Sequence, residues 1–583
     1  MKAAHEHPQE GAPKEPGPTF TRVCTAPGLT VLPPLGLFPV LQPEPGPPRP
    51  TVGPGLGAKT GSSTRNAGVM AAGTTLSRVS GFARLLAVGW VLGQGHLADA
   101  YNGANTVPNI IYELLLGGVL SATLLPVLMQ LLDRGDGPDA DEGVPAVVSF
   151  ITVVLLVATA AFWLGAPSII HFYLSGAKGN GAGAERALAT TWLRFFAPQL
   201  LFIGLIAVTT ALLNARRRFG SVAFSPVLAN VVTIVALVIA DHMVPHSSVT
   251  AYRGDAVAVT VVGIGTTAGY LVQLLAQLPA LLRARVPLRL VWRPRHPALR
   301  TIARLSGWTA GSVAANQASF LFVSVMAFRG GGNFSAFSYA YAFMLLPHAV
   351  VAVSIAYVVA PDLAELWSRG ERSGFAARAS YAVRVTLVLL LPGGVGYALV
   401  ARPAVVLALA HGHLASASAD LTGSLLVIFA LGLPGFSTYL LIMRAFQSMQ
   451  DTRSMFWLYL LENTLTVIAA LALYSPLGLR GLVIAWIGSY TLALPIAWWR
   501  LRKSAPVHVA ASWWVRAVGA TSVMAAVAAG LLKVLPATQS ALLSAGRICA
   551  VVVVGAVVFV LSARVLGIRE LAGLRARYRG EMG

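Results

Sequence analysis

Residues 76–127 decide the fold of this chain. They read LSRVSGFAR at 76–84, GQGHLADAYN at 93–102, VPNIIYE at 107–113 and GGVLSATLLPV at 117–127. Two long apolar segments here carry four charged residues at or within membrane depth: Arg78, Arg84, Asp99 and Glu113. A charge inside a bilayer costs several kcal/mol unless it faces water, a partner or a ligand. This stretch is therefore predicted to contain a functional site.

The composition is that of a membrane protein. Of the 583 residues, 56% are hydrophobic and 11% are charged, and the mean hydropathy is +0.70. A soluble globular protein has about 25% charged residues. Apolar runs of about 20 residues recur from Asn66 to Leu566, the length that crosses a bilayer as a helix. We predict an all-α polytopic membrane protein.

The net charge of +21 does not indicate a nucleic-acid partner. The basic residues fall in short gaps between apolar runs, without the interleaved aromatic residues that stack on bases. This pattern favours positive-inside topology and contact with anionic lipid. The two cysteines, Cys24 and Cys549, predict neither a disulfide framework nor a metal site.

About fourteen spans are predicted, at residues 66–92, 106–131, 144–167, 189–214, 222–243, 256–282, 301–328, 335–360, 380–400, 420–445, 455–475, 481–499, 515–535 and 545–566. Pro198, Pro347 and Pro434 interrupt three of them and are expected to kink the helices. Two short amphipathic pieces, Pro167–Ser175 and Pro403–Gly412, are predicted to lie along the membrane interface.

The arginines predict the orientation. An even number of spans places both termini on one side. If that side is the cytoplasm, the inner loops contain most of the arginines, including the Arg216–Arg218 run. The outer loops then contain only Lys178, Arg186, Arg253, Arg329, Arg402 and Arg480. This asymmetry predicts that both termini are cytoplasmic.

The chain repeats itself after six spans. APQL at 197–200, ARRRFG and VLAN at 227–230 return as GLPG at 432–435, QDTR and LLEN at 460–463, about 235 residues later. An even-numbered period gives a parallel repeat about an axis along the membrane normal. We predict a disordered Pro-rich cytoplasmic tail (1–62), an N-lobe (63–295, spans 1–6), a C-lobe (296–505, spans 7–12), spans 13–14 (506–570) and a basic cytoplasmic tail (571–583).

Two arginines are the main candidates for substrate binding. Arg78 and Arg84 are six residues apart on one helix, so they differ by roughly 120° around its axis and can both face a wide cavity. Guanidinium groups stay charged and bind phosphate oxygens bidentately, so this pair suits a phosphate or diphosphate. The alternative is snorkelling to the interface or a buried ion pair.

Asp99 precedes the second span at its outer end. It could close an outer gate by pairing with an arginine, or it could cap the helix of span two. Asn105, Asn109 and Glu113 are candidate polar residues of the cavity, and Glu113 could accept hydrogen bonds from Arg78 or Arg84.

A second polar group could form a coupling-ion site for Na⁺ or H⁺: Asn316, Gln317, Glu462, Asn463 and Thr466. Interhelical hydrogen bonding is the simpler interpretation, and we favour it. Arg444, Asp362 and Glu365 lie near predicted cytoplasmic ends, where charges are ordinary, and His348 beside Pro347 is interpreted as a packing residue.

The first two spans identify a family. SRVSGFAR, LADAYNGANTVPNI and SATLLPV resemble the signature of the MviN/MurJ lipid II flippases, and the resemblance extends over residues 64–570. The two-lobe repeat resembles the wider multidrug/oligosaccharidyl-lipid/polysaccharide exporter superfamily. The resemblance implies a V-shaped central cavity, and a groove of spans 13–14 for a polyprenyl tail. It also implies roles for Arg78 and Arg84 as substrate-binding cations and for Asp99 as the outer-gate acid.

This sequence departs from the family pattern at two places. Many members have an arginine pair after the P-N of span two and a glutamate before the next glycine, where this chain has Tyr112, Glu113 and Gly117. An arginine that many members carry in span eight is Ala342 here. The cavity is therefore expected to contain fewer cations.

These observations predict a transporter rather than an enzyme. The resemblance implies a lipid II flippase of the bacterial cytoplasmic membrane, working by alternating access without a cofactor and driven by a Na⁺ or H⁺ gradient or the membrane potential. Its expected partners are lipid II, membrane lipids and cell-wall synthesis proteins. The alternatives are an exporter of another undecaprenyl-linked glycan and a non-transporting cell-wall scaffold. A membrane glycosyltransferase is disfavoured because the outer loops are short and lack a catalytic acid and metal constellation.

Overall fold

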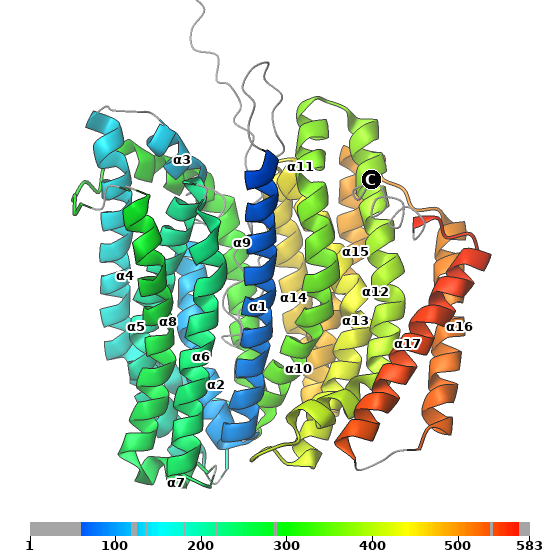
Figure 1. The fold of residues 1–583 in the computed structure, drawn as a ribbon, viewed down its shortest axis with the longest axis horizontal. Helices are drawn as coiled ribbons and strands as arrows, with labels where there is room; N and C mark the ends of the chain where they lie inside the picture. The colour runs from blue at the N-terminus through cyan, green and yellow to red at the C-terminus, as the bar shows by residue number, and fades with distance from the viewer. Residues whose placement is uncertain are drawn as a thin grey trace, which may run out of the picture.

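Long, nearly parallel helices run the height of the molecule (Figure 1). The computed structural model describes residues 60–117, 125–133, 138–179, 181–216, 218–246, 248–284, 286, 289–536 and 540–570. All regular structure in these residues is helical. Twelve of the described helical segments are long and apolar enough to cross a membrane, and α1 and α2 run alongside them. The all-α membrane fold predicted from the sequence is confirmed, with about fourteen crossings.

The first half of the chain forms the N-lobe, on the left of Figure 1. Its elements are α1 (Thr60–Leu92), α2 (His96–Tyr112), the π-helical turn η1 (Glu113–Gly117), α3 (Leu125–Asp133), α4 (Pro138–Tyr173), α5 (Ala182–Ala215), α6 (Phe219–Met243), α7 (Val249–Gly254) and α8 (Ala256–Arg283). The lower end in the figure, where α7 lies, is called the α7 end here, and the upper end is called the α3 end.

The second half forms the C-lobe and two further helices. The C-lobe elements are α9 (Pro297–Ala327), α10 (Asn333–His348), the π-helical turn η3 (Ala349–Val353), α11 (Ser354–Ser368), α12 (Arg372–Leu409), α13 (Ser416–Ser448), α14 (Thr452–Leu477) and α15 (Leu479–Ser504). The helices α16 (Ala511–Val534) and α17 (Ala541–Val565) pack on each other and on α12, at the far side of the C-lobe (Figure 1).

The structure corrects several predicted boundaries. The second span begins at His96 rather than at residue 106, and α1 begins at Thr60, so residues 60–62 are helical rather than part of the tail. Neither amphipathic piece is separate, because Pro167–Tyr173 continues α4 and Pro403–Leu409 continues α12. Residues 1–59 and 571–583, which contain the rest of both predicted tails, lie outside the described residues.

Proline has different effects at the three predicted kinks. Pro198 and Pro434 lie inside the uninterrupted helices α5 and α13. Pro347 lies at the end of α10 and is followed by the π-helical turn η3. A proline removes one backbone donor, and a π-helical turn is one way in which a helix adjusts to that loss.

The hydrophobic core joins the two lobes at the α7 end. One continuous cluster of buried residues includes Tyr173 of the N-lobe together with Phe328 and Phe334 of the C-lobe. The rings of Phe328 and Phe334 stack with centroids 4.3 Å apart, and the Tyr173 ring packs edge-on at 5.2 Å from Phe328. A separate cluster toward the α3 end consists mostly of N-lobe residues and also includes Ala298 and Ile302 of α9. Apolar packing thus fastens the lobes together near α7.

Candidate functional site

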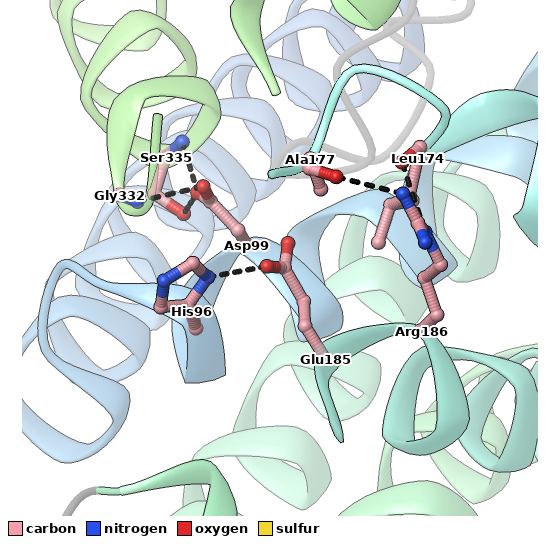
Figure 2. Close-up of polar contacts among 8 residues, drawn as sticks. All are labelled: His96, Asp99, Leu174, Ala177, Glu185, Arg186, Gly332 and Ser335. Carbon is pink, nitrogen blue, oxygen red and sulfur yellow. Dashed lines mark hydrogen bonds and ion pairs between the residues drawn. The ribbon is translucent and has the colours of Figure 1, made fainter. Parts of the chain in front are cut away.

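A carboxylate of the N-lobe caps a helix of the C-lobe. Asp99, in the first turn of α2, accepts hydrogen bonds from the backbone N–H of Gly332 (2.7 Å) and from the backbone N–H (2.8 Å) and hydroxyl (2.7 Å) of Ser335 (Figure 2). Gly332 precedes α10, so these are unpaired donors of the first turn of that helix. A negative charge at a helix N-terminus is also favoured by the helix dipole.

This arrangement differs from both sequence-based interpretations of Asp99. It does not pair with an arginine in this conformation, and it does not cap its own helix, whose N-cap is Gly95. Instead Asp99, which is 1% exposed, satisfies donors from a segment more than 230 residues away. We call the contacts of Asp99 and its neighbours across the lobes the α7-end seal.

A second carboxylate supports the seal from within the N-lobe. Glu185, near the start of α5, pairs with the imidazole of His96 (Figure 2). The next residue, Arg186, donates hydrogen bonds to the carbonyls of Leu174 (3.2 Å) and Ala177 (2.7 Å), which holds the α4–α5 connection in place. A Cβ atom at Gly331 would lie 2.6 Å from the imidazole Nε2 of His96, so glycine permits this close approach between the lobes.

Further hydrogen bonds cross between the lobes at the same end. They link Asn102 to Ser335 (3.0 Å), Thr422 to Gln94 (2.8 Å), the Trp90 indole to the Ala408 carbonyl (2.9 Å), the His413 amide to the Trp90 carbonyl (2.8 Å), and the His413 imidazole to Asp241 (2.9 Å). The seal therefore consists of side-chain and main-chain bonds from α1, α2 and α6 to α10, α12 and α13.

The two candidate substrate-binding arginines belong to α1, the N-lobe helix drawn next to the C-lobe in Figure 1. Arg84 is 4% exposed and interacts electrostatically with Tyr101 of α2. Arg78 is half-buried, and its Nε is a buried atom without a hydrogen-bond partner. A buried donor without a partner is costly, so Arg78 is suited to a group that supplies oxygen atoms.

The candidate polar residues of α2 are all buried. Asn109 donates to the carbonyl of Asn105 (3.0 Å), one turn earlier. Glu113 begins η1, and none of the ion pairs among the described residues joins it to Arg78 or Arg84, contrary to the sequence-based expectation.

The two departures from the family pattern are also buried. Tyr112 at the end of α2 is 4% exposed and Ala342 in α10 is fully buried, so both contribute packing rather than charge.

The candidate coupling-ion residues form two adjoining contacts in the C-lobe. The side-chain amide of Asn463 on α14 donates to the side-chain oxygen Oδ1 of Asn316 on α9 (2.5 Å). Glu462 Oε1 accepts from the hydroxyls of Thr466 (3.1 Å) and of Ser489 on α15 (3.0 Å), and the two hydroxyls are 2.5 Å apart. Two buried acceptors remain without a hydrogen-bond partner: Glu462 Oε2 and Gln317 Oε1. The described residues contain no group of three or more His, Cys, Asp or Glu able to hold a metal.

Sequence reasoning missed several residues that form hydrogen bonds at the predicted sites. Asn102 lies three residues after Asp99, on the same face of α2, so helical spacing alone could have found it. Ser335 and Ser489 gave no such signal, because serine is common at helix starts and in membrane helices. Arg444 and His348, interpreted from the sequence as ordinary, line one pocket.

Comparison with known proteins identifies the family. The family described as lipid II flippase MurJ matches residues 88–552. The chain belongs to the lipid II flippase MurJ family. The probable lipid II flippase MurJ of Vibrio cholerae is 26% identical over 392 residues, covering 66% of this chain and 73% of the relative. The lipid II flippase MurJ of Burkholderia cenocepacia is 27% identical and covers 65% and 72%, and the probable one of Rhizobium meliloti is 28% identical and covers 73% and 79%.

Solved structures agree with the MurJ assignment at the level of fold. A lipid II flippase MurJ in an inward closed conformation superposes with a TM-score of 0.70 at 18% identity, covering 86% of this chain and 99% of that chain. A multidrug resistance MATE transporter in an inward-facing conformation gives 0.57 at 20% identity, covering 72% and 93%. Both similarities support the predicted two-lobe fold. The MurJ structure aligns with a larger share of this chain than the MATE transporter does.

Proposed function

We propose that this chain is a lipid II flippase, which moves the undecaprenyl-diphosphate-linked peptidoglycan precursor across the bacterial cytoplasmic membrane. Membership of the MurJ family supports this assignment. The structural observation that carries it is a pair of arginines in an apolar helix of the N-lobe, together with a network of buried hydrogen bonds that links the two lobes at the α7 end. Fixed cations in a membrane helix suit a diphosphate carried by alternating access.

The orientation follows from the charges of the loops. Arg369, Arg372, Arg453, Arg500 and Arg502 all lie at the α3 end, together with Arg289, Arg293 and Arg295 of the α8–α9 connection. The positive-inside rule therefore supports a cytoplasmic α3 end and cytoplasmic termini. The α7-end seal then faces outward, so the structure represents a state closed to the outside.

The transport cycle follows from these parts. Lipid II enters from the cytoplasmic side and its diphosphate binds Arg78 and Arg84, while its polyprenyl tail lies along the groove of α16 and α17. The inner side then closes, and α10 separates from Asp99 to open the α7 end. After lipid II is released on the outer side, the protein returns to the sealed state. The substrate shifts this equilibrium only as far as it binds one state better than the other.

A coupling cation is proposed at Glu462. Its unpartnered Oε2 is buried beside the hydroxyls of Thr466 and Ser489, and a Na⁺ or H⁺ would satisfy that oxygen. Binding there would join α14 to α15 and would connect an ion gradient to the packing of the C-lobe.

Complementation tests the proposed function. Wild type, Arg84→Ala and the control Arg453→Ala would be compared at matched expression in a bacterium depleted of its own lipid II flippase, with an assay for lipid II on the outer face. We expect rescue by wild type and by Arg453→Ala, because Arg453 is exposed at the start of α14. Arg84→Ala removes a buried cation and should reduce outer-face lipid II at least about tenfold.

The alternatives give different results in the same assay. An exporter of another undecaprenyl-linked glycan would be well expressed and give no lipid II on the outer face. A cell-wall scaffold would restore growth equally in wild type and Arg84→Ala, without lipid II translocation by either protein.

A further inference from the structure

The C-lobe contains a pocket between α11 and α13 that the proposed transport cycle does not use. About 400 Å³ of space lies within and in front of it, because the pocket is partly open to the outside. The space exists because small residues, Ala352 of η3 and then Ala356 and Ala360 of α11, face the larger side chains of α13.

Two hydrogen bonds link α13 to the helices on the other side of the pocket, one to α10 and one to α11. At the deeper end, the His348 Nδ1 and the Ser437 hydroxyl are 2.9 Å apart. Toward the α3 end, the Ser448 hydroxyl donates to the Ala360 carbonyl at 3.2 Å. The helices that line the pocket are therefore held together by hydrogen bonds beside it.

His348 lines this pocket and has an unsatisfied ring nitrogen. The side chain is 1% exposed and lines the pocket, yet its Nε2 has no hydrogen-bond partner. If the Ser437 hydroxyl donates to Nδ1, Nε2 carries the proton and is a donor. Buried polar groups are nearly always satisfied, so this nitrogen indicates an occupant with an acceptor atom.

Arg444 supplies a fixed positive charge to the same pocket. It donates to Gln447 Oε1 (2.8 Å), which uses one of its five N–H groups. No carboxylate of the described residues lies within 4.0 Å of it, and no acidic side chain lines the pocket. Arg444 and His348 interact electrostatically, as two groups facing one small space do. This chemistry favours an anion over a cation.

We infer that the pocket between α11 and α13 binds a small oxyanion, a phosphate group held by the guanidinium of Arg444 and the Nε2–H of His348. Free inorganic phosphate and the head group of an anionic phospholipid share this chemistry. Neither Arg78 nor Arg84 is among the lining residues, so the site is additional to the proposed diphosphate site. An occupant would tie α11 to α13 near the end of the span that begins at Gly332.

Binding of radiolabelled inorganic phosphate to the purified full chain tests this inference without requiring transport. The chain would be placed in nanodiscs of phosphatidylcholine. We expect Arg444→Gln to weaken binding at least about tenfold, the effect of losing a charge-assisted bond. Ala356→Phe fills the pocket without changing charge and should give a comparable loss. Arg453→Gln removes an exposed arginine at the same end and should leave binding unchanged.

A second measurement distinguishes the two sources of phosphate. In nanodiscs containing phosphatidylglycerol, native mass spectrometry would measure lipid retained by wild type and by Arg444→Gln. Retention by wild type alone, without free phosphate binding, assigns the site to a lipid head group. The inference is overturned if neither phosphate nor lipid binding depends on Arg444, or if Arg453→Gln causes the same loss. Monodisperse gel filtration of each variant confirms that a loss of binding is not a loss of fold.

Discussion

The two ends of the span that runs through α10, η3 and α11 are built differently. At the α7 end, Asp99 satisfies the free donors of Gly332 and Ser335, and the buried rings of Phe328 and Phe334 stack beside them. Toward the α3 end, the same span borders a pocket where the Nε2 of His348 has no partner. One end is satisfied by the protein itself, and the other has polar groups available for a ligand.

This difference separates two kinds of conformational change. The α7 end opens and closes without a ligand, whereas the packing around the pocket can respond to one. Because the α7-end seal consists only of protein groups, the residues that form it determine the free energy of opening it. A site that needs an occupant changes its packing with the concentration of that occupant. Substitutions at the seal should therefore shift the open–closed equilibrium in proportion to the bonds they remove.

Asp99→Ala should have the largest effect on the seal. It removes three charge-assisted hydrogen bonds and leaves two amides and a hydroxyl without their acceptor, a loss of roughly 3 kcal/mol or about a hundredfold in the closed-to-open ratio. The measurement is labelling of a cysteine placed at Ser338, which is 1% exposed, by an impermeant maleimide from outside. The background would be Cys24→Ser/Cys549→Ser.

Asp255→Ala is the matched control for that measurement. Asp255 also caps a helix at the α7 end, accepting from Val257 and Ala258 at 2.9 Å, but donor and acceptor belong to the same lobe. Its loss should cost about 1 kcal/mol of helix stability and leave Ser338Cys protected. Equal labelling of the two variants would contradict a specific role for Asp99.

Gly332→Ala should have an intermediate effect. Gly332 has φ +84°, a conformation that alanine adopts with strain, and the added Cβ would lie 2.9 Å from the Gln94 carbonyl oxygen. A cost of about 1–3 kcal/mol in the sealed state should raise maleimide labelling roughly tenfold. Gly254→Ala at the same end, with open space around its Cβ, should behave as wild type. No change in either variant would show that the α9–α10 turn relaxes freely.

His413→Gln should have the smallest effect. The pair between His413 and Asp241 crosses the lobes, but its side chains are 28% and 38% exposed. Partly exposed ion pairs contribute about 0–1 kcal/mol, so labelling should change less than about fivefold. A change as large as that of Asp99→Ala would mean that the outer rim, rather than the buried cap, holds the seal.

The sequence predicted the spans well but placed the start of the second span ten residues late. Residues 96–105, which include Asp99 and Asn102, are too polar to be recognised as a membrane segment. In the structure these polar groups face α10, which satisfies them, so the helix extends through them. Their partner lies far away in the chain, and periodicity within one segment cannot reveal it.

The candidate site shows the same limit. Arg78 and Arg84 stood out because charge in an apolar run is visible locally. Arg444 and His348 are 96 residues apart, and each has an ordinary explanation by itself. Only the packing of α11 against α13 brings them together, and the small residues that leave the pocket open carry no signal of their own.

The capping of α10 by Asp99 also bears on how freely the outer surface of the protein can change in sequence. Two of the three donors are main-chain amides, which are present whatever side chain occupies a position, proline excepted. These two bonds therefore tolerate many side chains at the donor positions, whereas Asp99, the Ser335 hydroxyl and the small residues Gly331 and Gly332 remain constrained. A contact of this kind, buried and made to amides, is also screened little by salt, so the closed state should persist through large changes in external ionic strength.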